Sequence, residues 1–190
     1  MSETATTQIA QPLSRAEIEP PGFETIAGTN VEHRAAQRSK TRCPRLGFLG
    51  VGWIGRHRLE AIAQSGAAEV AGIADASAAL AAEAAERVPS AKVASTFEDL
   101  VGMGIDGVVI ATPSALHAEQ AAAALARGVP VFCQKPLGRT AQETRAVIEA
   151  ARQADLLLGV DLSYRFMSGV RQIHELCRSG ELGEIYAVDL

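Results

Sequence analysis

The sequence predicts an α/β fold built on a doubly wound parallel sheet. Short apolar runs alternate with alanine-rich segments of helical periodicity. The runs lie near residues 45–50, 68–74, 106–112, 130–134 and 156–162. Near-continuous apolar strands separated by helices are typical of parallel sheets that are covered on both faces. A glycine-rich turn after the first run and an acidic residue after the second also favour this class.

The first predicted strand leads into the pattern Gly50-x-Gly52-x-x-Gly55. In dinucleotide-binding turns the first glycine permits the tight turn, the second lets the backbone approach a pyrophosphate, and the third lets the helix pack close to the strand. The amides at the start of the following helix attract phosphates. We expect Trp53 and Ile54, which lie inside the loop, to contact the cofactor; Trp53 would alternatively shield the helix start.

The second predicted strand ends at Asp75, 20 residues after Gly55. A carboxylate at this place accepts hydrogen bonds from the adenosine ribose hydroxyls and repels a 2′-phosphate. NAD is therefore favoured over NADP. Arg56, just inside the first helix, is a candidate partner for such a phosphate and keeps NADP as an alternative.

A weaker strand is expected over residues 91–97, and the fourth strand ends in Thr112-Pro113. Pro113 blocks continuation of the ladder, and Ser114 is suited to cap the next helix. Ligands of open parallel sheets bind at the carboxyl ends of the strands. We therefore expect Thr112 and Pro113 at the cofactor site.

The fifth predicted strand ends in the same crevice, with Gln134-Lys135-Pro136. A lysine delivered there would stand beside the nicotinamide end of a bound dinucleotide and could exchange a proton with a substrate. The next helix, over 140–154, opens with the capping box Thr140-x-x-Glu143.

Composition restricts the class of protein further. The 190 residues are 47% hydrophobic and 21% charged, with a net charge of −4, as in ordinary soluble globular proteins. Membrane and nucleic-acid partners are not expected, because no run reaches the ~18 apolar residues of a membrane span and basic clusters are missing from the sequence.

The cysteines, Cys43, Cys133 and Cys177, are odd in number and far apart. This spacing indicates neither a disulfide framework nor a metal site, so we expect a cytoplasmic protein without a bound metal. Free cysteines usually fill the core, and none of the three is expected to be a nucleophile.

Five pieces of the chain together resemble the N-terminal domain of the Gfo/Idh/MocA oxidoreductases, which include glucose–fructose oxidoreductase and inositol dehydrogenase. The pieces are GFLGVGWIGRH, the strand end at Asp75, ATPSALH, CQKPLGRT, and SYRF followed by SGELGEI. The resemblance covers about residues 45–190 and implies a Rossmann domain that binds NAD or NADP. It also implies that Lys135 is the catalytic group.

The resemblance adds two residues to the expected cofactor site. His117 matches the family's T-P-x-x-x-H spacing, with a structural role at the helix start as the alternative. Arg165, in SYRF, matches a recurrent position near the site, with an interdomain salt bridge as the alternative. Members carry glutamate in place of Gln134, and the neutral amide removes a charge-assisted bond to the cofactor ribose.

A second departure concerns length. Family members continue into a substrate domain built on an antiparallel sheet, and a histidine of that domain partners the lysine in many dehydrogenases. We therefore expect a disordered extension over 1–44, a dinucleotide-binding domain over 45–165, and over 166–190 a connecting helix with the first strand of a truncated second domain. This fragment is expected to show little turnover, and a homo-oligomer only in a full-length form.

The resulting hypothesis is a fragment of an NAD(P)-dependent oxidoreductase. It would transfer hydride between nicotinamide and the carbinol carbon of a sugar, cyclitol or related polyol, with Lys135 as proton donor and acceptor. A non-catalytic dinucleotide-binding module is the first alternative. A methyltransferase using S-adenosylmethionine is the second, although it gives the loops at Thr112-Pro113 and Lys135-Pro136 no clear role.

Overall fold

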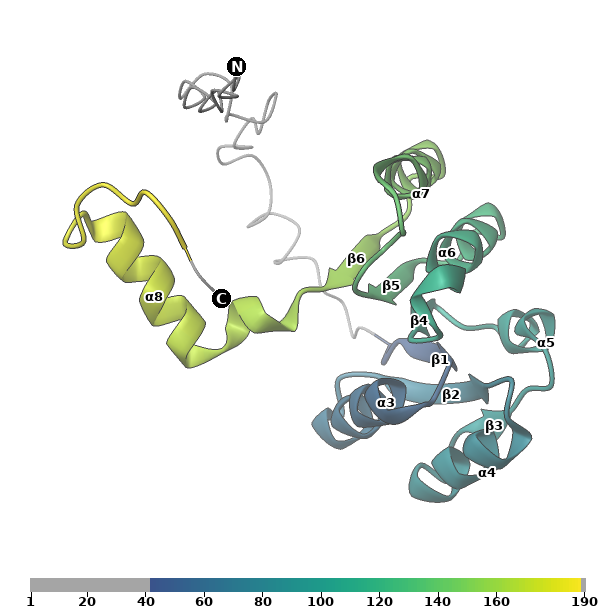
Figure 1. Cartoon of the computed structure of the whole chain (residues 1–190). Coiled ribbons are helices and arrows are strands. Elements are labelled where there is room, and N and C mark those ends of the chain that lie inside the picture. The colour runs from purple at the N-terminus through teal and green to yellow at the C-terminus, as the bar shows by residue number, and fades with distance from the viewer. Residues whose placement is uncertain (1–41, 189–190) are drawn as a thin grey trace, which may run out of the picture. The chain divides into compact units, whose positions relative to one another are not determined.

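The computed structural model describes residues 42–188, which contain one six-stranded, all-parallel sheet (Figure 1). The strands are β1 (Arg45–Leu49), β2 (Glu69–Ala74), β3 (Lys92–Val93), β4 (Gly107–Ile110), β5 (Val131–Gln134) and β6 (Leu158–Asp161). Their order, β3-β2-β1-β4-β5-β6, reverses direction between β1 and β4 and confirms the predicted doubly wound class. The predicted extension over 1–44 lies, apart from residues 42–44, outside the described residues.

Among the described residues, five helices connect successive strands and cover both faces of the sheet, and a sixth follows β6 (Figure 1). They are α3 (Trp53–Ser65), α4 (Ala78–Arg87), α5 (Phe97–Gly102), α6 (His117–Ala126), α7 (Ala141–Gln153) and α8 (Ser168–Ser179), with the 3-10 helices η1 (Ser114–Leu116) and η2 (Ser163–Phe166). One core cluster joins α3 and α4 to the sheet, around Phe48, Leu59 and Ile73. The other joins α5, α6 and α7 to the opposite face, around Ile110 and Leu125.

Local sequence signals explain where several helices begin. The Thr140 hydroxyl accepts a hydrogen bond of 3.1 Å from the Glu143 amide, as the capping box predicts. The Glu143 carboxylate accepts its bond of 2.7 Å from the Arg139 amide, one residue before the N-cap, and also pairs with the Arg139 guanidinium at 2.8 Å. Hydrogen bonding to Arg139 lowers the pKa of Glu143. Glu143 therefore caps the helix through two preceding residues: its amide donates to Thr140, and its carboxylate accepts from Arg139.

The last described segment differs from the prediction. Helix α8 forms within the expected 167–179, but none of its residues is buried, and Ile173 remains 61% exposed. No strand forms over 184–188, and residues 189 and 190 of the predicted strand lie outside the described residues. A strand needs a neighbouring strand for its hydrogen bonds, and this segment pairs with no strand among the described residues.

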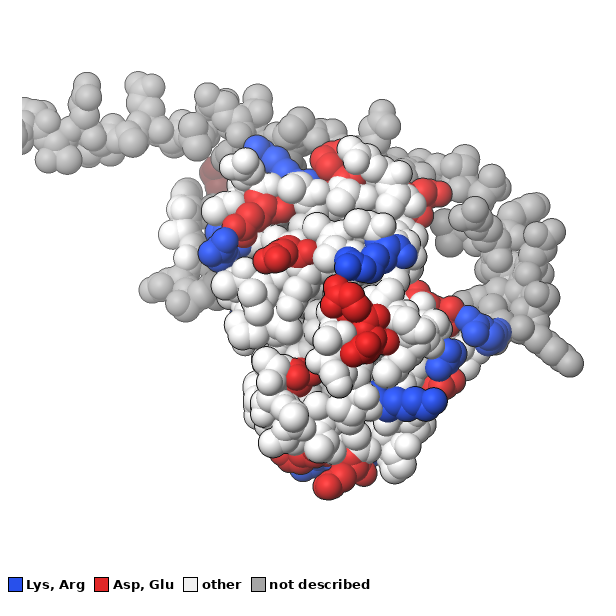
Figure 2. Space-filling view, turned by 90° about the vertical axis from the view of Figure 1, so that its right-hand side faces the viewer, with Lys and Arg blue, Asp and Glu red and all other residues white. Residues whose placement is uncertain are grey.

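Charged side chains are mixed in sign on the face shown in Figure 2. Arg127 pairs with Glu98 at 3.0 Å, and Arg152 with Glu149 at 2.7 Å. Such exposed pairs contribute only about 0–1 kcal/mol each to stability. Among the described residues, no helix is both long and apolar enough to cross a membrane.

Candidate cofactor-binding site

The glycine loop between β1 and α3 is closely packed on its protein side and open at its tip. Gly50 has a φ of 89°, and a Cβ added there would lie 2.6 Å from the Thr112 amide nitrogen. A Cβ at Gly55 would lie 2.1 Å from the Gly50 carbonyl oxygen, so only glycine fits. A Cβ at Gly52 would meet nothing within 4 Å. The loop therefore leaves a cradle in front of Gly52, at the N-terminus of α3, that suits a phosphate group.

Asp75 lies directly against this loop. Its carboxylate accepts a 2.7 Å hydrogen bond from the Val51 amide through one oxygen and a 2.8 Å bond from the Ser77 amide through the other. Each oxygen of an ionised carboxylate retains further lone pairs. Asp75 therefore holds the loop and can still accept hydrogen bonds from the hydroxyls of a ribose.

Arg56, the candidate partner for a 2′-phosphate, is engaged elsewhere. Its guanidinium pairs at 2.7 Å with Glu83 on α4, and Glu83 also accepts from Arg87 at 3.4 Å. The Arg56 guanidinium, which would have to pair with the 2′-phosphate of NADP, is thus already paired with the Glu83 carboxylate.

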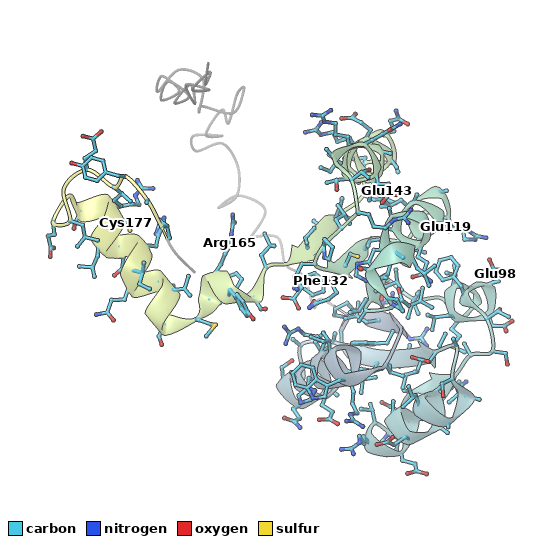
Figure 3. The ribbon with its side chains drawn as sticks, viewed as in Figure 1. Glu98, Glu119, Phe132, Glu143, Arg165 and Cys177 are labelled. Atoms are coloured by element: carbon cyan, nitrogen blue, oxygen red, sulfur yellow. The ribbon has the colours of Figure 1, made fainter. Side chains whose placement is uncertain are left out.

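A cavity of about 730 Å³ lies at the carboxyl ends of β5 and β6, within the size range of ligand pockets. Five of the predicted site residues line it: Trp53, Ile54, Gln134, Lys135 and Arg165. Arg165 is labelled on η2 in Figure 3. Trp53 is 69% exposed, and its ring lies 4.7 Å from the His57 ring, centroid to centroid. An apolar and partly cationic cavity therefore stands beside the open glycine loop.

The sequence reasoning missed one pair in this cavity. The Nε of Arg58, on α3, donates to the Asp161 carboxylate at the end of β6, and only 7% of the Asp161 side chain is exposed. The two residues are 103 positions apart, so no local motif could have revealed the pair. Hydrophobic spacing alone could have shown only that Asp161 lies at the end of a strand.

Thr112, Pro113 and His117 are not among the residues that line the cavity. His117 is 1% exposed, and its ring nitrogens lie 2.7 Å from the Pro136 carbonyl oxygen and 2.8 Å from the Thr112 carbonyl oxygen. Direct contact with a cofactor would require one of these bonds to break. The structure thus gives His117 the alternative, structural role: it joins the loop after β4 to the loop that carries Lys135. The Thr112 hydroxyl donates to the Gln120 side chain at 2.5 Å.

Cys133 is fully buried in β5, and burial raises the pKa of its thiol from 9.0 to about 12. The fraction present as thiolate is thus about 1,000-fold below that of an ordinary cysteine. We predict that iodoacetamide modifies the exposed Cys43 in the folded protein but not Cys133, which reacts only after unfolding; peptide mass spectrometry measures both. Because the folded-state pKa is the higher one, this group stabilises the fold below pH about 9 and loses that contribution as the pH rises toward about 12. Rapid modification of Cys133 by iodoacetamide in the folded chain would contradict the observed burial of its thiol.

Within residues 42–188, no group of three or more His, Cys, Asp or Glu side chains is arranged to hold a metal ion. The predicted site residues include the glycine loop, Asp75 and Lys135. All three lie at the same edge of the sheet, since the cradle and Asp75 follow β1 and β2 and Lys135 follows β5.

Comparison with known proteins agrees with the fold. Residues 44–162 match the oxidoreductase family with an NAD-binding Rossmann fold. The chain is 37% identical to the rhizopine catabolism protein MocA of Rhizobium meliloti over 76% of this chain and 45% of that protein. It is 35% identical to the inositol 2-dehydrogenase of Rhodococcus erythropolis over 73% of this chain and 41% of that protein.

Among solved structures, the chain resembles scyllo-inositol dehydrogenase from Lactobacillus casei with bound NAD(H) and scyllo-inositol. The TM-score is 0.70 at 26% identity, over 76% of this chain and 43% of that one. The chain thus spans less than half the length of the relatives it matches. It belongs to the Gfo/Idh/MocA oxidoreductase family, and residues 44–162 form the family's NAD-binding Rossmann domain.

Proposed function

We propose that this chain is the cofactor-binding part of an NAD-dependent oxidoreductase that acts on a polyol. The observation that carries the proposal is the common edge of the sheet. The open space at Gly52, proposed for the pyrophosphate, follows β1, and Asp75, proposed as the ribose acceptor, follows β2. Lys135 follows β5 and lines the cavity. An extended dinucleotide spans such a crevice from adenosine to nicotinamide.

Each residue has a definite part in the proposed reaction. The amides at the start of α3 would hold the pyrophosphate, and Asp75 would accept hydrogen bonds from the adenosine ribose. When bound, NAD supplies the acceptor for a hydride from the carbinol carbon. Lys135 would take the proton of the substrate hydroxyl in oxidation and return it in reduction. The Gln134 amide stands beside it and can both donate and accept.

The substrate class follows from the relatives. Two of them are named for inositol, and the Lactobacillus structure holds scyllo-inositol beside NAD(H). Cyclitols, sugars and related polyols share a secondary carbinol whose hydroxyl a lysine can reach. We therefore propose a compound of this chemical class as the substrate.

Asp75 and the Arg56–Glu83 pair both favour NAD over NADP. Asp75 repels a 2′-phosphate, and Glu83 forms an ion pair with Arg56, the candidate partner for that phosphate. NADP binding is expected to be weaker for both reasons.

The test is a calorimetric titration of the chain with NAD, NADP and S-adenosylmethionine side by side. Binding of NAD, weaker binding of NADP and no binding of S-adenosylmethionine are expected. A preference for S-adenosylmethionine would favour a methyltransferase and contradict the proposal.

Turnover by these 190 residues alone is expected to be negligible. In the described residues, the cavity is lined by α3, β5, β6 and the segment at η2, with nothing described that would enclose a substrate against solvent. We therefore expect the chain to bind NAD but not to oxidise any member of a panel of cyclitols and sugars. The absorbance of NADH measures that oxidation. Oxidation at an ordinary enzymatic rate, about 1–10³ per second, would contradict this expectation.

A further inference from the structure

The cavity contains one carboxylate and several cations that can compete for it. Asp161 is 6% exposed at the end of β6, and its pairing partner across the ladder is Gln134, the residue before Lys135. A carboxylate buried in a region of low dielectric constant strongly attracts a nearby ammonium group. Lys135 lines the same cavity as Asp161, so a Lys135–Asp161 ion pair is the alternative pairing for this carboxylate.

The structure shows a different pairing. Arg58, which is 33% exposed in its side chain, reaches from α3 and donates its Nε hydrogen bond to Asp161. Among residues 42–188, no ion pair joins Lys135 to a carboxylate. The other titratable groups that line the cavity are His57 of α3 and Tyr164 and Arg165 of η2, and none of them is a carboxylate.

We propose that Arg58 is a positioning residue that sequesters Asp161 and so leaves the Lys135 amine free for the substrate hydroxyl. This inference rests on the proposed function, in which Lys135 exchanges the substrate proton. A lysine held by a buried carboxylate stays protonated and cannot accept that proton, because a nearby opposite charge favours the charged form of an amine. Arg58 acts through its charge. A guanidinium group stays protonated, so it can remain ion-paired with the Asp161 carboxylate.

The small number of lysines allows the ion pairing of Lys135 to be measured directly. The sequence contains three lysines, Lys40, Lys92 and Lys135, and acetic anhydride reacts only with unprotonated amines. Limited acetylation of the full chain without cofactor, followed by peptide mass spectrometry, gives the reactivity of Lys135 relative to Lys92. Lys92 lies in β3, at the opposite edge of the sheet, and serves as the internal reference.

In Arg58→Met, the relative acetylation of Lys135 at neutral pH should fall about tenfold, because Asp161 becomes available to the lysine. Its pH profile should move to higher pH, while the profile of Lys92 stays in place. Adding Asp161→Asn to this variant should restore the wild-type ratio. Arg58→Lys, which keeps a cation, is the matched control and should resemble the wild type. Arg58→Gln is the second variant should Arg58→Met not fold. Its neutral side chain can still donate a hydrogen bond to Asp161, so a smaller fall in the relative acetylation of Lys135 is expected.

An unchanged Lys135 ratio in the folded Arg58→Met or Arg58→Gln variant would overturn the inference. So would a fall that Asp161→Asn does not reverse, since that result would assign Arg58 a purely structural role. Because labelling is done without cofactor, the two proposals fail separately. Loss of NAD binding by the wild-type chain would contradict the proposed function, whereas an unchanged labelling ratio would contradict the role of Arg58.

Discussion

Gly52→Val is expected to abolish NAD binding while leaving the fold intact. A Cβ at this position meets no protein atom within 4 Å, so the added side chain would occupy only the cradle. Hydrogen bonds from amides to charged phosphates contribute roughly 1.5–3 kcal/mol each. Blocking their approach should weaken NAD binding by about 100-fold or more. The free energy of unfolding should change by only about 1 kcal/mol, the usual effect at a helix N-cap.

Gly55→Ala is the comparison in the same loop, because a Cβ added there lies 2.1 Å from the Gly50 carbonyl oxygen. This variant should lose roughly 1–3 kcal/mol of unfolding free energy by overpacking. Gly102→Ala on α5, which also meets nothing within 4 Å, should affect neither NAD binding nor packing. Urea unfolding and calorimetry on the three variants separate the two effects. NAD binding by Gly52→Val at wild-type affinity would show that the phosphates lie elsewhere.

Asp75→Asn is expected to weaken NAD binding about tenfold and to reduce the preference for NAD over NADP. Hydrogen bonds to an ionised acceptor are roughly twice as strong as neutral ones, so the amide holds both the ribose and the Val51 amide less tightly. Removing the negative charge also removes the repulsion of a 2′-phosphate. Combining Asp75→Asn with Glu83→Gln should raise NADP affinity further, since Arg56 is then released from its 2.7 Å ion pair.

Glu60→Gln is the control for this series. Glu60 pairs with Arg87 at 3.1 Å, in the same group of charges as Glu83, but has no ion pair with Arg56. It should leave the affinities for both cofactors unchanged when they are titrated in parallel. A wild-type chain that prefers NADP, or an Asp75→Asn variant with an unchanged NAD-to-NADP ratio, would refute the assigned role of Asp75.

Features encoded locally could be predicted from the sequence. The strand positions, the glycine loop and the cap at Thr140 each depend on residues within a few positions of one another, and the structure contains them. The placement of Lys135 in a cavity at the sheet edge also followed, because parallel strands end at a common edge.

Features that depend on tertiary contacts could not be predicted. The Arg58–Asp161 pair joins residues 103 positions apart, and the burial of His117 follows from how two loops meet around its ring. The T-P-x-x-x-H spacing located this histidine but did not show that both ring nitrogens face backbone carbonyls. The segment over 184–188 has the apolar pattern of a strand, but pairing depends on a neighbouring strand and not on the segment itself.

The central claim is that a bound NAD brings its nicotinamide ring to Lys135. A crystal structure of the chain grown with NAD tests it most directly. We expect the pyrophosphate in front of Gly52, the adenosine ribose at Asp75, and the nicotinamide ring in the cavity beside the Lys135 amine. A nicotinamide ring outside this cavity, or an adenosine ribose remote from Asp75, would contradict the account.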